Sequence, residues 1–303
     1  MILSSKANAK INLFLKICGL LPEGYHRLYM LMQEISLGDE ISIEFGEPNS
    51  NPKINIVSQA DCPPEKDLCY RAAKAFYDEY SARNAKEQCV LCDITITENK
   101  VTPSQAGLGG GSSDAATVLK LLSQYYNNPF SQEELIEMSV GLGADVPFFI
   151  VGGSAICEGI GEVITPLPSL KDLPLLLVKP AEGVPTGPCF KLSDSKNRTF
   201  DEDAYRSLMN GIFDDANMSA MDRIKAASSY MVNDLQDPAM ELVPVIGEVI
   251  TELKKTAPVF CAMSGSGSCV FAIYDSVENR DKALNDFNRD AFPGCFILGC
   301  QTL

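Results

Sequence analysis

The chain opens with a stretch, residues 9–17, in which apolar and polar positions alternate. Every second residue from Ile11 to Ile17 is aliphatic, whereas Lys10 and Asn12 lie on the alternate face. A period of two residues is that of a β-strand with one face against the core. The pattern therefore predicts a half-buried strand on which Lys10 and Asn12 are neighbours.

Strand and helix periodicities alternate along the rest of the chain. A Ser131–Glu134 capping box predicts the start of a helix that ends near Gly141. A polar, acidic stretch, residues 193–215, is typical of an elaborated surface region, and the segment 46–53, rich in Pro and Asn, is typical of a loop. The other predicted elements are strands at 41–45, 93–97, 173–178, 259–263 and 269–274, and helices at 66–82, 117–126 and 245–255.

A glycine-rich loop directly precedes a predicted helix that begins where the glycines stop, after Gly111. Its core is Ala-Gly-Leu-Gly-Gly-Gly at residues 106–111, and Ser112, Ser113 and Asp114 are residue types that cap helix N-termini. Glycine allows backbone N–H groups to turn around an anion, and a helix N-terminus adds unpaired N–H groups and a positive dipole end. This segment predicts a phosphate-binding loop, which indicates a nucleotide-dependent enzyme.

Two common phosphate loops do not fit this segment. A Walker A loop requires a lysine after its last glycine, but Ser112 follows Gly111. A dinucleotide-binding fingerprint requires a strand that ends at the first glycine, whereas residues 100–105 separate the loop from the strand at 93–97. The remaining alternative is a surface turn that binds no ligand. Four glycines in five positions directly before a helix argue against this alternative.

The overall composition indicates a globular protein of two domains. The 303 residues are 46% hydrophobic and 21% charged, and a boundary near residues 166–172 gives domains of 1–168 and 169–303. The net charge of −15 argues against nucleic acids and anionic membranes as partners. An anionic substrate would therefore need a local cluster of cations, and Lys6, Lys10 and Lys16 all precede the first acidic residue, Glu23.

The eleven cysteines are scattered and do not form a disulfide framework. Cys89 and Cys92 have the spacing of a metal-binding pair, but residues i and i+3 of a strand point to opposite faces, and no second pair completes a zinc site. We expect reduced thiols in a cytoplasmic protein. The sequence also shows neither a membrane-spanning run nor a signal peptide.

Three features of the chain could together perform phosphoryl transfer. This reaction needs bound phosphates, neutralised charge, and a base or orienting group near the attacking hydroxyl. The loop at 107–113 is the candidate cradle, Lys10 the candidate cation and Asp145 the candidate base. The plainer alternatives are an exposed strand lysine and a turn residue that caps a helix end.

The motifs resemble those of the galactokinase, homoserine kinase, mevalonate kinase and phosphomevalonate kinase (GHMP) superfamily. The segment from Pro103 to Ser113 is similar to its phosphate loop. Within the superfamily, four further motifs, at residues 9–15, 24–26, 143–149 and 264–271, resemble those of kinases that act on a cytidine-diphosphate alcohol. The resemblance extends from residue 7 to residue 274 with the motifs in the same order.

The resemblance implies a two-domain α+β (two-layer α/β) fold with the active site in the cleft between the domains. It implies an ATP-binding domain at 1–168, a second GHMP domain at 169–303, and ATP with Mg²⁺ carried on its phosphates and no dedicated metal ligand. The small-molecule substrate would be the cytidine-diphosphate alcohol. The implied ATP-binding residues are Pro103, Ser104, Gln105, Ala106, Gly107, Leu108, Gly109, Gly110, Gly111, Ser112, Ser113 and Lys100.

The resemblance also implies individual roles for the remaining candidates. Asp145 would take the proton from the substrate hydroxyl, or mainly orient it, and Lys10 would keep Asp145 ionised and stabilise developing charge. The only histidine, His26, would recognise the cytosine beside the stacking ring of Tyr25. The implied substrate contacts are Asn12 and Thr186.

Two positions leave alternatives open. Lys100 would contact nucleotide phosphates or would be a solvated loop lysine. Asp114 stands where the superfamily more often has asparagine, and we expect its carboxylate to point away from the phosphates and cap the helix.

Alternatives to the predicted function are a homoserine or mevalonate type of GHMP kinase and a catalytically silent nucleotide-binding module. The segment Gly24-Tyr25-His26 argues against the first, and the presence of both Lys10 and Asp145 argues against the second. A mature plastid enzyme would have the same sequence features as a cytoplasmic one. The sequence does not indicate an oligomeric state.

Overall fold

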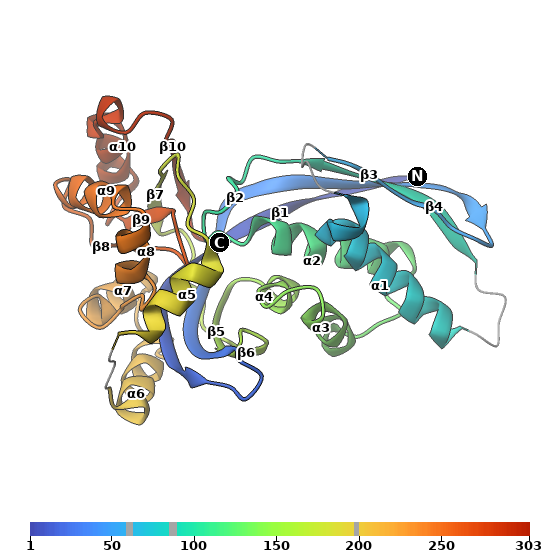
Figure 1. Ribbon diagram of the computed structural model, residues 1–303, viewed down its shortest axis with the longest axis horizontal. Coiled ribbons are helices and arrows are strands. Elements are labelled where there is room, and N and C mark those ends of the chain that lie inside the picture. Colours follow the sequence, from blue (N-terminus) through green and yellow to red (C-terminus); the bar gives the residue numbers. More distant parts are fainter. Residues whose placement is uncertain (59–62, 85–89, 197–199) are drawn as a thin grey trace. The chain divides into compact units, whose positions relative to one another are not determined.

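The computed structural model describes residues 1–58, 63–84, 90–196 and 200–303, and within them the chain forms a mixed α and β fold (Figure 1). The α+β class predicted from the sequence is confirmed. The strands are β1 (Ile2–Leu20), β2 (His26–Asn49), β3 (Ile54–Val57), β4 (Leu91–Asn99), β5 (Ser154–Gly159), β6 (Val163–Pro166), β7 (Pro174–Lys179), β8 (Phe260–Met263), β9 (Val270–Ile273) and β10 (Phe296–Gln301). The α-helices are α1 (Leu68–Arg83), α2 (Gly110–Tyr125), α3 (Gln132–Val140), α4 (Val146–Val151), α5 (Thr186–Asp194), α6 (Glu202–Phe213), α7 (Ala220–Ala227), α8 (Gln236–Leu242), α9 (Val245–Lys254) and α10 (Val277–Asp286).

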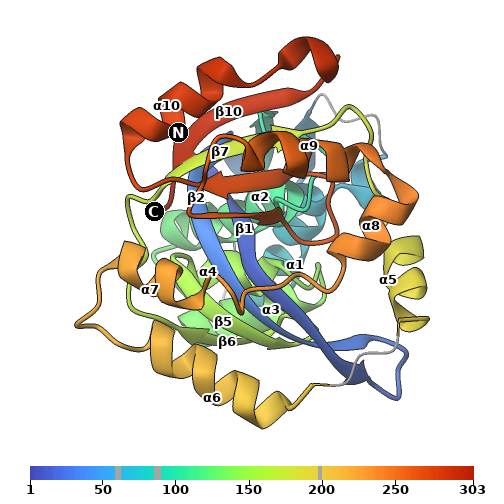
Figure 2. The ribbon, with the colours of Figure 1, turned by 90° about the vertical axis from the view of Figure 1, so that its left-hand side faces the viewer.

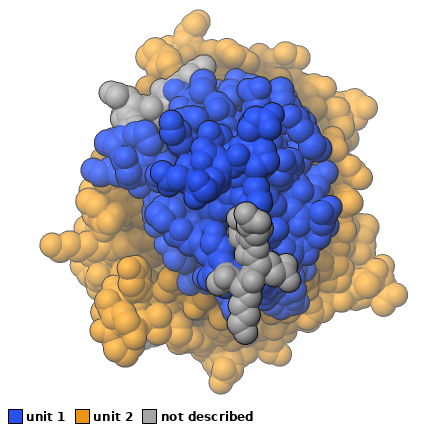
Figure 3. All heavy atoms as spheres, turned by 90° about the vertical axis from the view of Figure 1, so that its right-hand side faces the viewer, with its two compact units in different colours: residues 1–9, 38–102, 109–151 blue, residues 10–37, 103–108, 152–303 orange. Residues whose placement is uncertain are grey.

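The chain divides into two compact units, each built from separate segments (Figure 3). Unit 1 comprises residues 1–9, 38–102 and 109–151, and unit 2 comprises residues 10–37, 103–108 and 152–303. The long strands β1 and β2 therefore contribute residues to both units. The units differ from the consecutive division into 1–168 and 169–303 because the chain enters each unit more than once; that division stays a prediction about the family's domains.

Unit 1 combines strands with four helices. The second part of β2 pairs with β4 in antiparallel register, Ile43 opposite Ile96, and β3 pairs with β4 in parallel. Helices α1, α2, α3 and α4 pack against one another on one side of these strands (Figure 1). The buried side chains of α2 are mostly small or aliphatic, which lets this helix lie at the centre of the helical layer.

Unit 2 contains two antiparallel ladders. The first part of β2 pairs with β5, and β5 pairs with β6. A separate four-stranded sheet has the order β10-β7-β9-β8, with β7 buried along its whole length. Helices α9 and α10 contact this sheet (Figure 2).

Most predicted elements occur within two or three residues of their expected bounds.

The prediction that β1 is half buried is wrong. Lys10, Asn12 and Phe14 are all nearly fully buried, as are Ile11, Leu13 and Leu15 on the alternate face. The Tyr205 and Phe213 rings of α6 pack on Phe14, with ring centroids 5.8 and 6.4 Å away. Lys10 and Asn12 instead contact Leu108 and Ser264, which lie in two glycine-rich turns. Segments distant in the sequence therefore cover the second face, which the local pattern could not predict.

Two predicted surface segments also differ from the structure. The strand β2 continues to Asn49, so the loop expected at 46–53 is shorter. The stretch at 193–215 contains α6, whose Met209 and Phe213 are buried. None of the helices in the described part of the chain has the length and apolar character needed to cross a membrane.

Candidate active site

The glycine loop meets α2 at Gly109, not at the serines. Gly109 is the N-cap residue in a left-handed conformation (φ 70°), and no described side chain caps the helix. The prediction that Ser112, Ser113 and Asp114 cap α2 is therefore wrong, because all three lie inside the helix, after its N-cap residue Gly109. The first-turn N–H groups of a helix have no acceptor within the helix, so this uncapped start retains the features of an anion site.

The first half of the loop, Pro103–Leu108, packs on the second glycine turn, residues 264–268, within unit 2. The amides of Ser268 and Cys269 donate to the carbonyls of Gln105 and Ala106, each at 3.1 Å. The Ser264 hydroxyl donates to the Gly107 carbonyl at 2.8 Å. The structure thus brings together two glycine turns that lie about 160 residues apart in the sequence.

Gly107 could not carry a side chain in this arrangement. Its φ is +71°, and a Cβ atom would lie 2.0 Å from the Ser264 carbonyl oxygen. A backbone contact of this kind cannot relax by rotating a side chain. Glycine at this position is therefore required for the loop to rest on the second turn.

Lys10 and Asn12 lie at the same place in unit 2. The Lys10 ammonium donates to Asn12 Oδ1 at 2.5 Å, and the Lys10 amide donates to the Leu108 carbonyl at 2.9 Å. The Asn12 amide donates to Ser264 Oγ at 3.2 Å. Lys10, Asn12, Leu108 and Ser264 thus form one connected group, and Lys10 is a buried lysine, not an exposed strand lysine.

Asp145 belongs to unit 1, where it follows α3 and directly precedes α4. It is partly buried. The neighbouring Gly143 lies beside the start of α2, since a Cβ on it would be 3.9 Å from Ser112 Oγ. Within unit 1, the segment that carries Asp145 and the phosphate-loop end of α2 are therefore neighbours.

His26 is held by α5 in unit 2. Its Nε2 lies 2.7 Å from Asp194 Oδ1, and its ring stacks on Phe190 at a centroid distance of 4.7 Å. Tyr25, the preceding residue, is 62% exposed and its ring is available to a ligand. Sequence reasoning missed Phe190 and Asp194, although their i, i+4 spacing on a helix places both on one face.

Thr186 lies at the other end of α5. Its hydroxyl is 2.9 Å from the hydroxyl of Ser266 in the second glycine turn. One helix therefore links the predicted substrate-side residue Thr186 with the His26 contacts. The predicted substrate-binding residues Asn12, Tyr25, His26 and Thr186 thus all lie in unit 2.

Lys100 forms ion pairs with two carboxylates in unit 1, Asp39 at 2.5 Å and Asp114. Lys100 is therefore not a solvated loop lysine, because its ammonium is already paired with two carboxylates. Asp114 does not cap α2 as expected. Burial disfavours the charged lysine, but Asp114 and Asp39 outweigh it and raise the pKa of Lys100 to about 12. Burial raises the pKa of Asp114 to about 7 despite Lys100.

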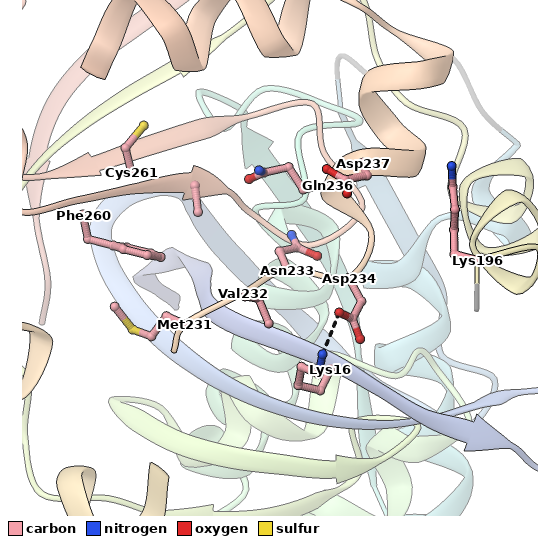
Figure 4. Close-up of a pocket in the computed structure, with 11 residues that line it drawn as sticks. Lys16, Lys196, Met231, Val232, Asn233, Asp234, Gln236, Asp237, Phe260 and Cys261 are labelled. Carbon is pink, nitrogen blue, oxygen red and sulfur yellow. Dashed lines mark hydrogen bonds and ion pairs between the residues drawn. The ribbon is translucent and has the colours of Figure 1, made fainter. Parts of the chain in front are cut away.

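A pocket of about 430 Å³ lies elsewhere in unit 2 (Figure 4). Lys16 of β1, Phe260 of β8 and residues 231–234, 236 and 237 form much of its wall. Lys16 donates to Asp234 Oδ1 at 2.9 Å, and the Ile17 amide donates to the other oxygen. Among the described lining residues, Lys16 is one of the three lysines named above as candidate cations for an anionic substrate, and the ATP and substrate residues implied by the resemblance do not line this pocket.

The structure describes nine of the eleven cysteines as free thiols, most of them buried. Cys92 is one of them, whereas Cys89 lies outside the described residues, so the Cys89–Cys92 geometry stays a prediction.

Two family patterns match the chain: GHMP kinases N terminal domain at residues 67–153, and GHMP kinases C terminal at residues 215–294. A protein from Clostridium beijerinckii named 4-diphosphocytidyl-2-C-methyl-D-erythritol kinase is 40% identical over 272 residues, which covers 90% of this chain and 91% of that protein. The chain belongs to the GHMP kinase family. The phosphate loop identified above is therefore the loop of a GHMP kinase, a family whose members use ATP.

Solved structures agree with this assignment. A crystal structure of 4-(cytidine 5'-diphospho)-2C-methyl-D-erythritol kinase superposes with a TM-score of 0.75 at 28% identity, and the match covers 99% of this GHMP kinase and all of that chain. A homoserine kinase from Cytophaga hutchinsonii gives the same TM-score at 16% identity, covering 98% of this chain and 94% of that one. At 16% identity the second likeness concerns the fold alone.

Proposed function

We propose that this GHMP kinase transfers the γ-phosphoryl group of ATP to the 2-hydroxyl of 4-diphosphocytidyl-2-C-methyl-D-erythritol, a step of non-mevalonate isoprenoid precursor synthesis. The observation that carries the proposal is the 40% identity to a kinase of that name over nine-tenths of both chains. The arrangement around His26 supports the same substrate, because the cytosine base of that substrate would need an aromatic surface and fixed polar atoms to bind.

The ATP phosphates would lie in the loop from Pro103 to Ser113. Backbone N–H groups at the uncapped start of α2 would bind the phosphate oxygens. The packing of Pro103–Leu108 on the second glycine turn supports this role, because it holds the loop backbone in one conformation before ATP arrives. Since Lys100 already pairs with Asp39 and Asp114, its contribution to ATP binding would be to position the loop.

Asp145 and Lys10 would carry the chemical step. Asp145 would accept the proton of the substrate 2-hydroxyl as that oxygen attacks the γ-phosphorus, or would orient the hydroxyl in a loose transition state. Lys10, fixed by Asn12 and by the Leu108 carbonyl, would stabilise the negative charge that develops. The connection of Lys10 to the loop supports a role next to the phosphates.

The cytidine end of the substrate would bind along α5. His26 would recognise the polar edge of the cytosine, with Asp194 fixing its ring orientation, and Tyr25 would stack on the base. Phe190, on the other side of His26, would hold the histidine in place. Asn12 and Thr186 would contact the remainder of the substrate.

Mg²⁺ would be carried on the ATP phosphates. Magnesium prefers oxygen ligands and keeps several waters. The Ser112 hydroxyl, close to Gly143 and at the start of α2, is an oxygen donor of the right kind on unit 1. The donor chemistry therefore fits magnesium, which when bound would neutralise phosphate charge. The free thiols in the described part of the chain support a cytoplasmic location.

The test is an ATP-consumption assay with purified protein and four alcohols: the cytidylated substrate, homoserine, mevalonate and galactose. We expect turnover with the cytidylated alcohol alone. Turnover with homoserine or mevalonate instead would favour another GHMP kinase activity, for which the likeness to homoserine kinase supplies the fold. Binding of ATP without turnover of any alcohol would favour a silent nucleotide-binding module.

A further inference from the structure

A second polar cluster lies in unit 1, outside the residues assigned to the kinase reaction. It consists of Asp67 and Cys69 at the start of α1 and Glu98 near the end of β4. One ligand atom from each residue lies within 4.8 Å of the other two. The residues are only 8%, 2% and 6% exposed, respectively.

The surrounding structure holds each carboxylate through one oxygen. Asp67 Oδ1 accepts both capping bonds of α1, from the amides of Cys69 at 2.8 Å and Tyr70 at 3.3 Å. Glu98 Oε2 accepts from the Ser58 hydroxyl at 2.9 Å. Such contacts orient side chains in the way that outer-shell hydrogen bonds orient metal ligands.

The other oxygen of Glu98 has no such contact. Glu98 Oε1 is buried and accepts no N–H or O–H hydrogen bond from the residues that the structure describes, and the Cys69 thiol is the neighbouring group that can donate to Glu98. A buried acceptor of this kind is costly to leave unmatched, which makes it an indication of a positively charged ligand.

The three groups of the cluster are all acidic, and burying them side by side makes each of them hard to ionise unless a cation binds between them. The nearby cation Lys100 already forms ion pairs with Asp39 and Asp114.

We propose that Asp67, Cys69 and Glu98 bind one zinc ion that joins the start of α1 to β4. Two carboxylate oxygens and a thiolate are a zinc donor set, and the sulfur ligand disfavours magnesium and calcium. Zinc–ligand bonds of about 2.0–2.3 Å place tetrahedral ligands roughly 3.3–3.8 Å apart, so small side-chain rotations would close the site around the ion. A water molecule would complete four-coordination.

Binding needs no oxidant or reductant. The Cys69 S–H bond breaks, its proton leaves to solvent, and a zinc–sulfur bond forms while zinc stays divalent. The competing arrangement is a metal-free cluster in which the thiol proton is shared between Cys69 and Glu98. The two arrangements differ in whether the thiolate is available to a metal.

Cobalt titration of chelator-treated, full-length protein tests the site, because Co²⁺ bound to a thiolate gives a charge-transfer absorption band. We expect the band to saturate at one cobalt per chain and to disappear when zinc is added. Zinc should also raise the melting temperature. The absence of a thiolate band in the wild-type protein would overturn the proposal in favour of the shared proton.

Two variants and a control assign the band to the cluster. Cys69→Ser should abolish it, whereas Cys295→Ser, which changes a partly exposed thiol in unit 2, should leave it unchanged. Glu98→Gln keeps the thiol and the side-chain volume, and should weaken cobalt affinity at least about tenfold. An equal band in Cys69→Ser would overturn the proposal; if that variant does not fold, the Glu98→Gln affinity decides, and an unchanged value counts against the site.

Discussion

Asp114 illustrates how burial changes the chemistry of one carboxyl group. It is 2% exposed, shares Lys100 with Asp39, and its pKa rises from 3.8 to about 7. Asp39 accepts hydrogen bonds from Lys100 and from the amides of Val101 and Thr102, and these bonds keep its pKa lowered in spite of burial. Lys100 also pairs with Asp114, but Asp114 Oδ1 has no hydrogen-bond partner among the described residues, and burial makes this carboxyl hard to ionise.

The raised pKa of Asp114 predicts a pH dependence of stability. Between pH 3.8 and about 7 the folded protein holds a proton that the unfolded chain releases, so this group makes unfolding easier as the pH rises through that window. Asp114→Asn should remove this slope and gain about 1–3 kcal/mol relative to wild type near neutral pH. Urea unfolding at several pH values measures it, with Asp286→Asn on the exposed face of α10 as the control. An unchanged slope in Asp114→Asn would contradict the assignment.

Phe190 makes a prediction about substrate binding. Its ring stacks on His26, so Phe190→Ala should leave the histidine less ordered for cytosine. An aromatic pair contributes about 0.5–1.5 kcal/mol, which corresponds to a KM for the cytidylated substrate raised roughly two- to tenfold. Steady-state kinetics should show an unchanged KM for ATP, which serves as the internal control. A change confined to ATP would place the cytosine elsewhere.

The candidate residues differ in how far the sequence could reveal them. Lys10 and Asn12 follow from a two-residue period, and their hydrogen bond agrees with that placement. Phe190 and Asp194 could not be assigned, because their partner His26 is more than 160 residues away and no local pattern records the contact. The same limit applies to Asp39, which meets Lys100 across 61 positions.

At the level of elements, the contact between the two glycine turns gives a sharp prediction. In Gly107→Ala the new Cβ would overlap the Ser264 carbonyl, and the positive φ adds strain. We expect a loss of roughly 1–3 kcal/mol in unfolding free energy and a higher KM for ATP. Gly141→Ala is the matched control, since nothing lies within 4 Å of its Cβ position and its φ is −69°. Equal stability of the two variants in urea would show that the turns do not depend on this contact.

The attachment of α6 predicts behaviour in acid. Glu202 accepts from Arg27 of β2 at 2.6 Å and from Arg206 at 2.9 Å, and these bonds lower its pKa from 4.5 to about 2. The stabilisation is complete above pH 4.5 and is lost as the pH falls toward 2. Glu202→Gln should therefore lower stability by about 1 kcal/mol at pH 6 and flatten the acid limb of the stability curve. Circular dichroism during acid titration checks this, and an acid limb identical to that of wild type would argue against the pair.

The elements themselves were largely predictable, and their burial was not. Helix α3 begins with the predicted capping box, and α9 ends within one residue of its expected bound, because both signals are local. The burial of Phe14 on the second face of β1 depends on α6, whose Phe213 lies 199 positions beyond it. Periodicity identifies the apolar face of a strand, but it does not show whether residues distant in the sequence cover the opposite face.

At the scale of the whole molecule, the order of segments along the chain does not follow the compact units. Unit 1 takes three separate segments, and both long strands contribute to both units. Composition and linker signals describe consecutive stretches, so they indicate a boundary near residue 168 and cannot reveal that residues 10–37 belong with residues 152–303. Discontinuity of this kind follows from strand pairing, which a single sequence does not record.

The net charge of the molecule makes a final prediction, about the salt dependence of catalysis. The protein carries a net charge of −15, and both proposed substrates are anionic, so the long-range field opposes their approach while Lys10 acts only at short range. Salt shortens the Debye length from about 30 Å at 0.01 M to about 8 Å at 0.15 M, which screens the distant repulsion more than the buried lysine. Over that range, with magnesium held constant, kcat/KM for ATP should rise up to a few-fold while kcat stays level, because screening alters encounter and not the bound complex. Stopped-flow or steady-state measurements against KCl test this. A steep fall of kcat/KM with salt would mean that a local positive field steers the nucleotide and outweighs the charge of the whole molecule.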